Sequence, residues 1–492
     1  MAGKARSSAR SRNGASDRAR VRVRMYRQGL GDAFLLTFDP DGHDPAHVLI
    51  DLGTIGVGSG IDMNRVVAEL MQETRGHLCA VVATHEHQDH VSGFPKALKA
   101  GLAADEAWLA WTEDATDGDA KGLQRYRGDL VGAAATATVA LERSKQRDHQ
   151  MLARAAWEVL AFQDSKTSLV QLAAKGLAGG LARRTAAGMD AAMSMAPDGL
   201  HYFSPGDVIE RAWAPGIRFF VLGPPRSHSA LRNLGAHGSP DLYELAAAAG
   251  VGFADDRQPP PPFEARFKIG RQQLTPEIAA MCGAEPWRCI DGIGLAGAAE
   301  LALQLDNLTN NTSLVLAIEI DGDRVLLFAA DAQLGSWLTW GDVGFVVPED
   351  GRRRTVTGRD LLERTVFYKV GHHASHNATA SRSGLELMGG AGLTAFVPLD
   401  RKVAEKKRWS MPAKNLDTAL RRKTRGRVFC SDTAESARGV LVTRESVDYT
   451  LPALRAARGP IVVPDLPSRP RPAPVRRAGA TARQRGRRAS HR

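Results

Sequence analysis

The chain has 492 residues, 43% of them hydrophobic, so it is long enough for one large domain with insertions or for two to three ordinary domains. Its net charge of +11 comes from the ends, because residues 1–24 hold eight Lys or Arg against one Asp and residues 455–492 hold eleven Arg against one Asp. Residues 25–454 therefore carry a net charge of −6, which argues against a folded body that is itself a nucleic-acid platform.

The first predicted elements are a tail, several strands and one helix. Residues 1–20 are rich in Arg, Ser, Ala and Gly without periodicity, and we expect a disordered basic tail there. Apolar residues at helical spacing over 63–71 predict an amphipathic helix. Alternating or continuous apolar residues predict strands at 21–27, 33–38, 47–50 and 78–83.

Two long insertions are predicted in the middle of the chain. Residues from about 105 to about 200 are rich in Ala and are interpreted as a helical insertion. Its helical segments are predicted at 141–154, 155–162 and 169–174. A strand at 217–222 follows and ends in Gly223-Pro224-Pro225. Residues from about 225 to about 295, which include four consecutive prolines, are interpreted as a loop-rich second insertion.

Strands resume after the second insertion. Asp321-Gly322 is a strong turn signal and predicts a hairpin between strands at 313–320 and 324–330. Strands are also predicted at 366–370, 394–397, 427–430 and 440–443, with a helix at 412–424. This mixture predicts one α/β domain of sandwiched layers over residues 21–450. The Pro- and Arg-rich residues 455–492 predict a second disordered tail.

Cysteine usage and hydropathy bear on the compartment. The four Cys are widely spaced without a C-x-x-C pair, which fits a reducing compartment and neither a disulfide scaffold nor a thiolate zinc site. Without a long apolar run or a secretory leader, we expect no membrane span and a cytoplasmic protein, with a transit peptide as the alternative for the N-terminus. The basic tails are expected to be solvated arms, and the alternative is that they bind nucleic acid without sequence preference.

Residues 84–90 hold the densest group of metal-ligand side chains in the sequence. The run T-H-E-H-Q-D-H places three of the 14 His and one Asp directly after the strand predicted at 78–83. A nearly extended chain projects His85 and His87 to one side, where they can share one metal, while Asp89 and His90 turn toward a second. The pattern therefore predicts two divalent metal ions, with Zn²⁺ expected and Mn²⁺ or Fe²⁺ as alternatives.

This H-x-H-x-D-H pattern is the hallmark of the metallo-β-lactamase superfamily, which the chain resembles over most of residues 22–447. The resemblance implies an αββα sandwich with a helical insertion. It also implies that Asp51 supports the metal-binding loop without ligating a metal itself and that Asp331 bridges the two metals. A His from the doublet His372-His373 is implied as a ligand of the second metal, and the sequence leaves open which one.

Further motifs are similar to the hydrolase domain of ComEC-type DNA-uptake competence proteins. They are G-L-G-D-A at 29–33, N-N-T-S at 310–313 and H-H-A-S at 372–375. The chain departs from that branch at Leu30, Ala330 and Ala374, where the branch has Gln, Gly and Gly, and its membrane channel segments have no counterpart here. In the second motif, Asn311 and Ser313 are interpreted as turn-forming residues, with a substrate contact as the alternative.

One metal ligand of the superfamily has no equivalent in this sequence. Many members take a third His for the first metal from the strand end that here reads Val221-Leu222-Gly223-Pro224, and Gly223 has no side chain to offer. The candidate replacements are His228, five residues further on, and one histidine of the doublet.

The resemblance implies a hydrolase that uses a metal-activated water, with Asp89 as the proton acceptor and Asp51 in support. A phosphodiester in nucleic acid or a nucleotide-like substrate is the expected class, because the ComEC-type branch resembles nucleases and phosphodiesterases. Hydrolysis of a carboxylic ester, lactone or amide at the same metals is the alternative activity. A catalytically silent interaction module is the alternative outside enzymes.

Overall fold

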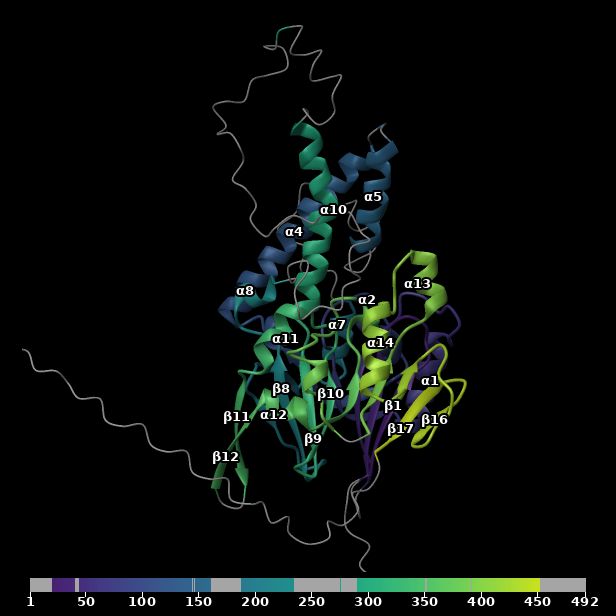
Figure 1. The fold of residues 1–492 in the computed structure, drawn as a ribbon, viewed down its shortest axis with the longest axis vertical. Helices are drawn as coiled ribbons and strands as arrows, with labels where there is room; N and C mark the ends of the chain where they lie inside the picture. The colour runs from purple at the N-terminus through teal and green to yellow at the C-terminus, as the bar shows by residue number, and fades with distance from the viewer. Residues whose placement is uncertain are drawn as a thin grey trace, which may run out of the picture. The chain divides into compact units, whose positions relative to one another are not determined.

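Two large β-sheets hold most of the strands in the part of the chain that the structure describes (Figure 1). The first sheet has the strand order β16 (Val440–Val442), β17 (Ser446–Thr450), β1 (Arg20–Tyr26), β2 (Ala33–Asp39), β3 (Ala46–Leu52), β4 (His77–Val82), β5 (Ala103–Ala110) and β6 (Leu200–Phe203). The second has the order β15 (Val428–Cys430), β14 (Thr394–Val397), β13 (Thr365–Lys369), β10 (Arg324–Phe328), β9 (Val315–Ile320), β8 (Ile217–Gly223) and β7 (Val208–Ile209). A separate hairpin pairs β11 (Gly344–Glu349) with β12 (Arg352–Thr357).

The computed structural model describes residues 20–39, 44–143, 145, 147–160, 187–233, 275, 290–349, 352–390 and 392–451. Its helices are α1 (Met63–Thr74), α2 (Gln88–Val91), α3 (Phe94–Lys99), α4 (Gly118–Glu142), α5 (Arg147–Leu160), α7 (Ala187–Ser194), α8 (His228–Leu231), α10 (Ile290–Asn311), α11 (Leu334–Trp340), α12 (Gly358–Glu363), α13 (Arg401–Lys407) and α14 (Lys414–Lys423). Short 3₁₀ turns lie at η1 (Trp111–Glu113), η6 (His372–Ala374) and η7 (Leu385–Leu387). Within these ranges no helix is long and apolar enough to cross a membrane.

The two sheets face each other through one apolar core. Phe34 and Leu36 of β2 pack in the same buried cluster as Phe219 of β8, because alternate residues of a strand point to the same face. The intervening Leu35 points the other way, into a cluster with α1, α3 and α7. On the outer face of the second sheet, Trp337 of α11 packs in one cluster with residues of α12 and α14. Each sheet is therefore buried on both faces, which explains the continuous apolar strands.

The strands that lead into the predicted site are parallel to their neighbours. β3, β4, β5 and β6 run parallel in the first sheet, and β10, β13, β14 and β15 run parallel in the second. Side chains that follow the carboxyl ends of parallel strands gather at one edge of a sheet, which is where open α/β sheets bind ligands. The ends of β4, β10 and β13 carry the histidine and aspartate motifs.

The prediction of a mixed α/β fold is confirmed, and the strands predicted from the sequence are present with ends shifted by at most two or three residues. The predicted hairpin is also present: β9 pairs antiparallel with β10, and Asp321 and Gly322 have positive φ angles of 55° and 73°. The sequence analysis did not predict β5, β6, β7, β17, the β11–β12 hairpin, α2, α3, α11, α12 and α13.

The start of the helical insertion was predicted wrongly. β5 occupies the first residues assigned to it, and the helices begin at α4, where the Asp117 side chain accepts hydrogen bonds from two backbone N–H groups. The break between α4 and α5 falls after Glu142, inside the helix predicted at 141–154. α7 packs on the outer face of the first sheet. The helix predicted at 169–174 lies outside the described residues.

The loop-rich interpretation of residues 225–295 was wrong at both of its ends. α8 lies near its start, and α10 begins at Ile290. The sequence of α10 hides its helical period, because glycines interrupt its first turns and apolar residues surround its axis. In Figure 1, α10 runs beside α4 and α5, and Leu305 of α10 packs with Ala134 of α4 and Trp157 of α5.

The tail predictions fall mostly outside the described residues. Arg20 is an exception, because it begins β1. Arg24 in the same strand forms a salt bridge of 2.8 Å with Asp448 of β17, and Arg22 pairs with Glu73 of α1. Part of the positive charge assigned to the N-terminal end is therefore used inside the fold.

Candidate metal centre

Asp51 ties the end of β3 to the histidine-rich loop after β4. Its Oδ1 accepts a hydrogen bond from the backbone N–H of Thr84, and its Oδ2 accepts one from the Thr84 hydroxyl, both at 2.8 Å. The same Oδ2 accepts a third from His90 Nδ1 at 2.8 Å. Asp51 is buried and has a φ angle of 56°. The Asp51 side chain therefore orients the loop through the backbone of Thr84 and fixes the ring of His90.

The loop after β4 brings four of the predicted ligands together. His85 and His87 leave the strand in extended chain, and His85 Nε2 lies 3.1 Å from His87 Nδ1. α2 then begins at Gln88 and turns Asp89 and His90 toward the second sheet. There His90 Nε2 lies 3.2 Å from Asp331 Oδ2. The three histidines and the aspartate are all buried.

The doublet after β13 divides between two roles. His373 is buried; its Nδ1 donates to the carbonyl of Pro398 at 2.7 Å, and its Nε2 lies 2.8 Å from Asp89 Oδ2. The ring of His372 is held at 2.8 Å by Ser375 Oγ, whereas its backbone N–H donates to Asp331 Oδ1 at 2.8 Å. His373 therefore contacts the other predicted ligands through its ring, whereas His372 contacts them through its backbone N–H.

Four buried side chains meet closely enough to hold one metal ion. They are Asp32, His90, Asp331 and His373, and one ligand atom of each lies within 4.8 Å of the others. Within the described ranges Asp32 Oδ1 and Asp89 Oδ1 have no hydrogen-bond partner, and His90 Nε2 and Asp331 Oδ2 have none besides each other, at 3.2 Å. Buried polar atoms short of partners are costly and uncommon, so these four in one place fit a cation that would satisfy them. A divalent ion therefore suits the residues that are present.

The charge of the cluster also favours a cation. Asp32, Asp51, Asp89 and Asp331 are buried together, and Lys369 lies among them with its Nζ against Asp32, 3.4 Å from Asp331 Oδ1 and 2.9 Å from the Ala330 carbonyl. Buried carboxylates need opposite charge nearby. A single lysine leaves an excess of negative charge here, so further positive charge must come from protons on the histidines or from metal.

The pKa shifts have the same electrostatic cause. Burial lowers the pKa of His90, but the charges of Asp331, Asp32 and Asp51 outweigh it and raise that pKa well above its usual value. Burial raises the pKa of Asp89, but the hydrogen bond from His373 and the charges of His90 and His373 lower it to about 2. His87 behaves differently, because burial lowers its pKa to about 4. Its ring is therefore neutral at physiological pH, the form that binds metals.

The G-L-G-D-A and N-N-T-S motifs position the ligands. Asp32 N–H donates to the Asp89 carbonyl at 2.9 Å, which places the Asp32 side chain in the cluster. Ser313 Oγ accepts from the Asp331 N–H at 3.3 Å and lies 3.3 Å from His85 Nδ1. Asn311 donates to the Leu231 carbonyl and accepts from the Gln333 N–H. Asn311 and Ser313 therefore connect α10 to the loop that carries Asp331.

The structure does not bring Gly223 or His228 to the place where the resemblance implies a third histidine. Gly223 ends β8, and a Cβ placed there would point at Ser336 and Val315. His228 begins α8 and is exposed. Neither belongs to the ligand cluster found among the described residues, and the His373 ring is directed to Asp89.

Sequence analysis missed four side chains at the site. Asp32 was noted in a motif but not as a ligand, and Lys369 precedes the doublet. Asp306 on α10 lies with its Oδ1 3.7 Å from His87 Nε2, and burial together with the charges of Asp89 and Asp331 raises its pKa to about 8. Arg127 of α4 pairs with Glu86 inside the histidine motif, and burial lowers the pKa of Arg127 to about 10. Arg127 was missed because it comes from the helical insertion, and Asp306 was missed because it comes from a helix that the sequence did not reveal.

We expect Gly53→Ala to disrupt the centre. A Cβ on Gly53 would lie 2.3 Å from the carbonyl carbon of Asp89 and 2.4 Å from the backbone nitrogen of His90. These atoms cannot move unless α2 moves, so the variant should bind less metal than wild type and lose about 1–3 kcal/mol of stability. Elemental analysis and urea unfolding measure both quantities. Gly122→Ala on α4 is the matched control, because its Cβ meets nothing within 4 Å. Wild-type metal content in Gly53→Ala would contradict this packing.

Comparison with known proteins gives no relative from which the site could be assigned: no family model matches the sequence, and no curated protein is significantly similar to it.

Proposed function

We propose that the chain is a metal-dependent hydrolase of the metallo-β-lactamase fold that acts on phosphodiesters. One observation carries the proposal: ring nitrogens and carboxylate oxygens from the ends of β4, β10 and β13 converge, while other atoms of the same side chains are held by hydrogen bonds. This is the arrangement of a metal centre, in which outer partners orient the ligands. Two face-to-face sheets with helices packed on their outer faces support the αββα assignment.

The residues divide into two half-sites. His85 Nε2 and His87 Nδ1 would hold the first ion, and Asp89, His90 Nε2 and His373 Nε2 would hold the second. Asp331 and Asp32 would contribute carboxylate oxygens beside these ligands. Zn²⁺ is the expected metal for this set of nitrogen and oxygen donors, with Mn²⁺ or Fe²⁺ as alternatives. When bound, such a pair supplies hydroxide near neutral pH and polarises a phosphoryl oxygen.

The chain's own groups have defined tasks in this mechanism. Asp51 holds the His90 ring and the Thr84 backbone, so it fixes ligand geometry. Asp89 uses Oδ2 toward His373, while its Oδ1 has no hydrogen-bond partner among the described residues and is available to accept a proton. Lys369 offsets the charge of Asp32 and Asp331 where the two carboxylates approach. The Arg127–Glu86 pair holds the loop against α4.

A basic segment beside the centre favours an anionic substrate. Residues 401–425 contain ten Lys or Arg against Glu405 and Asp417, although residues 25–454 are net negative. The segment is joined to the doublet loop, because the Ala413 N–H donates to the Ala374 carbonyl at 2.8 Å. Its exposed cations include Lys402, Lys406, Arg408 and Lys414. Such a surface attracts phosphate-bearing polymers.

A substrate screen on the metal-loaded protein tests the proposal. Bis-p-nitrophenyl phosphate should be hydrolysed faster than p-nitrophenyl acetate, a lactone or a β-lactam, and a chelator should stop the reaction. Preference for an ester or lactone would move the substrate to the carbon-centred class. A metal-loaded protein that hydrolyses none of them would contradict the enzyme assignment and favour an interaction module.

We expect removal of both tails to weaken nucleic-acid binding while leaving hydrolysis of the small diester intact. The truncation must stop at residue 18, because β1 begins at Arg20. Deleting residues 1–18 and 455–492 removes 15 Arg and one Lys against two Asp, so the affinity that depends on salt should fall. Binding of a labelled oligonucleotide at two salt concentrations measures this. An unchanged affinity and salt slope would instead assign binding to residues 401–425, which a variant with Lys402, Lys406 and Lys414 replaced by Ser would confirm.

A further inference from the structure

Each histidine of the centre has two ring nitrogens, so one can face a metal while the other faces an outer partner. His90 Nδ1 donates to Asp51, His373 Nδ1 donates to the Pro398 carbonyl, and His85 Nδ1 lies 3.1 Å from the Thr84 hydroxyl and 3.3 Å from Ser313 Oγ. Such outer partners fix the tautomer of a ligating histidine and the direction of its free nitrogen. The His87 ring needs the same support for Nδ1 to face His85.

Asp306 is the side chain placed to give it. His87 Nδ1 lies 3.1 Å from His85 Nε2, and on the other side of the ring His87 Nε2 lies 3.7 Å from Asp306 Oδ1. The second oxygen of the carboxyl group is fixed, because Asn310 Nδ2 donates to Asp306 Oδ2 at 3.2 Å. The side chain of His87 is 3% exposed and that of Asp306 is 17% exposed, so the contact is nearly closed to solvent.

The helix that carries Asp306 is anchored at this position. Ala302, Leu305 and Leu308 lie on one face of α10 and pack into the cluster formed with α4 and α5. Asp306 and Asn310 are four residues apart and share another face. Beyond them, the Asn311 side chain bonds to the Leu231 carbonyl and the Gln333 N–H. The carboxyl group is therefore held at the metal loop by packing on one side and by hydrogen bonds at the helix end.

We propose that Asp306 is the positioning residue of the first metal half-site, where its carboxylate accepts the Nε2–H of His87 and keeps Nδ1 directed at the position shared with His85 Nε2. The inference rests on the proposed function, since it concerns the metal that His85 and His87 would bind. A contact of 3.7 Å is longer than a hydrogen bond, and Asp89 and Asp331 repel the carboxylate when no cation lies between them. Positive charge at the half-site would offset that repulsion and let the carboxylate accept the Nε2–H of His87.

α10, which packs with α4 and α5, thereby becomes part of the metal centre. The first half-site has only two histidines, because Gly223 stands where the superfamily has a third. The carboxylate from α10 compensates by making His87 a better-oriented and more basic ligand. Affinity at this half-site then depends on a residue that is remote in sequence from the histidine motif.

Metal binding by Asp306→Asn tests the proposal without relying on activity. Wild type and variant are loaded with Zn²⁺, equilibrated with chelators of graded affinity, and analysed for bound metal. Wild type should retain close to two ions per chain. The variant should release one of them at a chelator strength roughly 10–100-fold lower and keep the other, because losing an outer partner costs that much affinity. Asp306→Glu should restore part of the affinity, and Asp129→Asn on α4, which is exposed, should behave as wild type.

The tautomer of His87 gives a second readout that a merely structural role would not move. In the zinc-loaded protein labelled with ¹⁵N-histidine, His87 should be protonated at Nε2 in wild type and should lose that fixed state in Asp306→Ala. Two ions bound with wild-type affinities in Asp306→Asn, or an unchanged His87 tautomer in Asp306→Ala, would overturn the inference while leaving the proposed function standing. A wild-type protein that binds no metal would overturn both.

Discussion

We expect Asp89→Ala to lower diester hydrolysis by on the order of a thousandfold, because the change removes a metal ligand and the carboxylate oxygen that is free to accept a proton. Asp89 Oδ2 meets His373 at 2.8 Å, so the variant also loses the link between the loops after β4 and β13. Steady-state turnover of the metal-loaded variant, corrected for bound metal, measures the effect. Asp89→Asn keeps the shape of the side chain and should show a similar loss of turnover.

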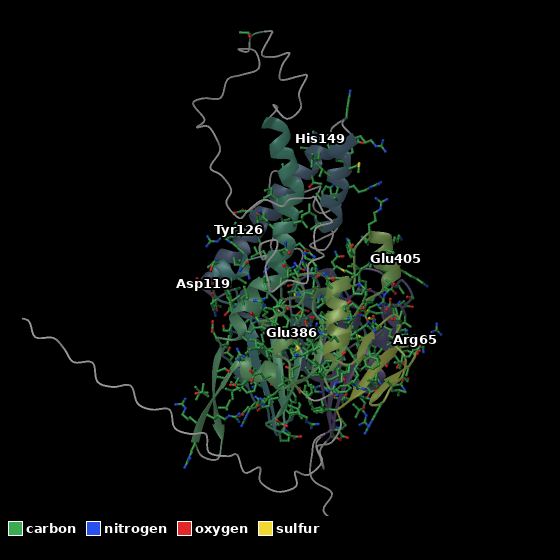
Figure 2. All side chains as sticks on the ribbon, in the orientation of Figure 1. Arg65, Asp119, Tyr126, His149, Glu386 and Glu405 are labelled. Atoms are coloured by element: carbon green, nitrogen blue, oxygen red, sulfur yellow. The ribbon has the colours of Figure 1, made fainter. Side chains whose placement is uncertain are left out.

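The fold should survive this substitution. The backbone of Asp89 keeps its contact with the Asp32 N–H at 2.9 Å, and the side chain is not part of the apolar clusters. Asp119→Ala is the matched control, because Asp119 is an exposed acid on α4 (Figure 2) and should leave turnover unchanged. Retention of wild-type turnover by folded Asp89→Ala would show that the catalytic site lies elsewhere.

The second large effect concerns stability. We expect Lys369→Met to cost about 3–5 kcal/mol in the metal-free protein, because it leaves Asp32 and Asp331 buried without the cation that separates them. Lys369 is itself buried and lies against Asp32 and 3.4 Å from Asp331 Oδ1. Urea unfolding with a chelator present gives the free energy of unfolding. Bound metal should reduce the cost, because it supplies positive charge to the same carboxylates.

Lys402→Met provides the control for the Lys369 variant. Lys402 is exposed on α13, and replacing it should change the free energy of unfolding by no more than about 0.5 kcal/mol. A Lys369→Met protein as stable as wild type, with and without metal, would contradict the electrostatic account of the cluster.

The sequence predicted the fold well where strands were buried on both faces. Continuous apolar runs predicted β2, β4, β9 and β10, and Asp321-Gly322 predicted the hairpin, because these features are determined by neighbouring residues in the sequence. α10 was not predicted, since its packing against α4 and α5 stabilises a helix that has no amphipathic period. The predicted helix boundaries in the helical insertion were wrong for a different reason. An alanine-rich sequence favours helix nearly everywhere and does not mark where one helix ends.

The residues of the site also divide into those that the local sequence predicted and those that only the fold revealed. Residues that are close in sequence were predicted as a group, because H-x-H-x-D-H places its ligands by local geometry alone. Asp32, Lys369 and Asp306 were missed because their role depends on how loops from different strands and helices meet. The choice between His372 and His373 also needed the fold: the His373 ring contacts Asp89 and Pro398, whereas the His372 ring contacts Ser375.

Metal stoichiometry is the measurement that tests the central claim most directly. Protein purified without chelator, then reconstituted with Zn²⁺ and passed through a desalting column, should contain close to two ions per chain by elemental analysis. The double variant His90→Ala, Asp331→Ala should contain fewer and should hydrolyse no diester. A value near one in wild type would confine the account to the half-site of Asp89, His90 and His373. A value near zero after reconstitution would contradict it, since the buried carboxylates and histidines would then serve the fold alone.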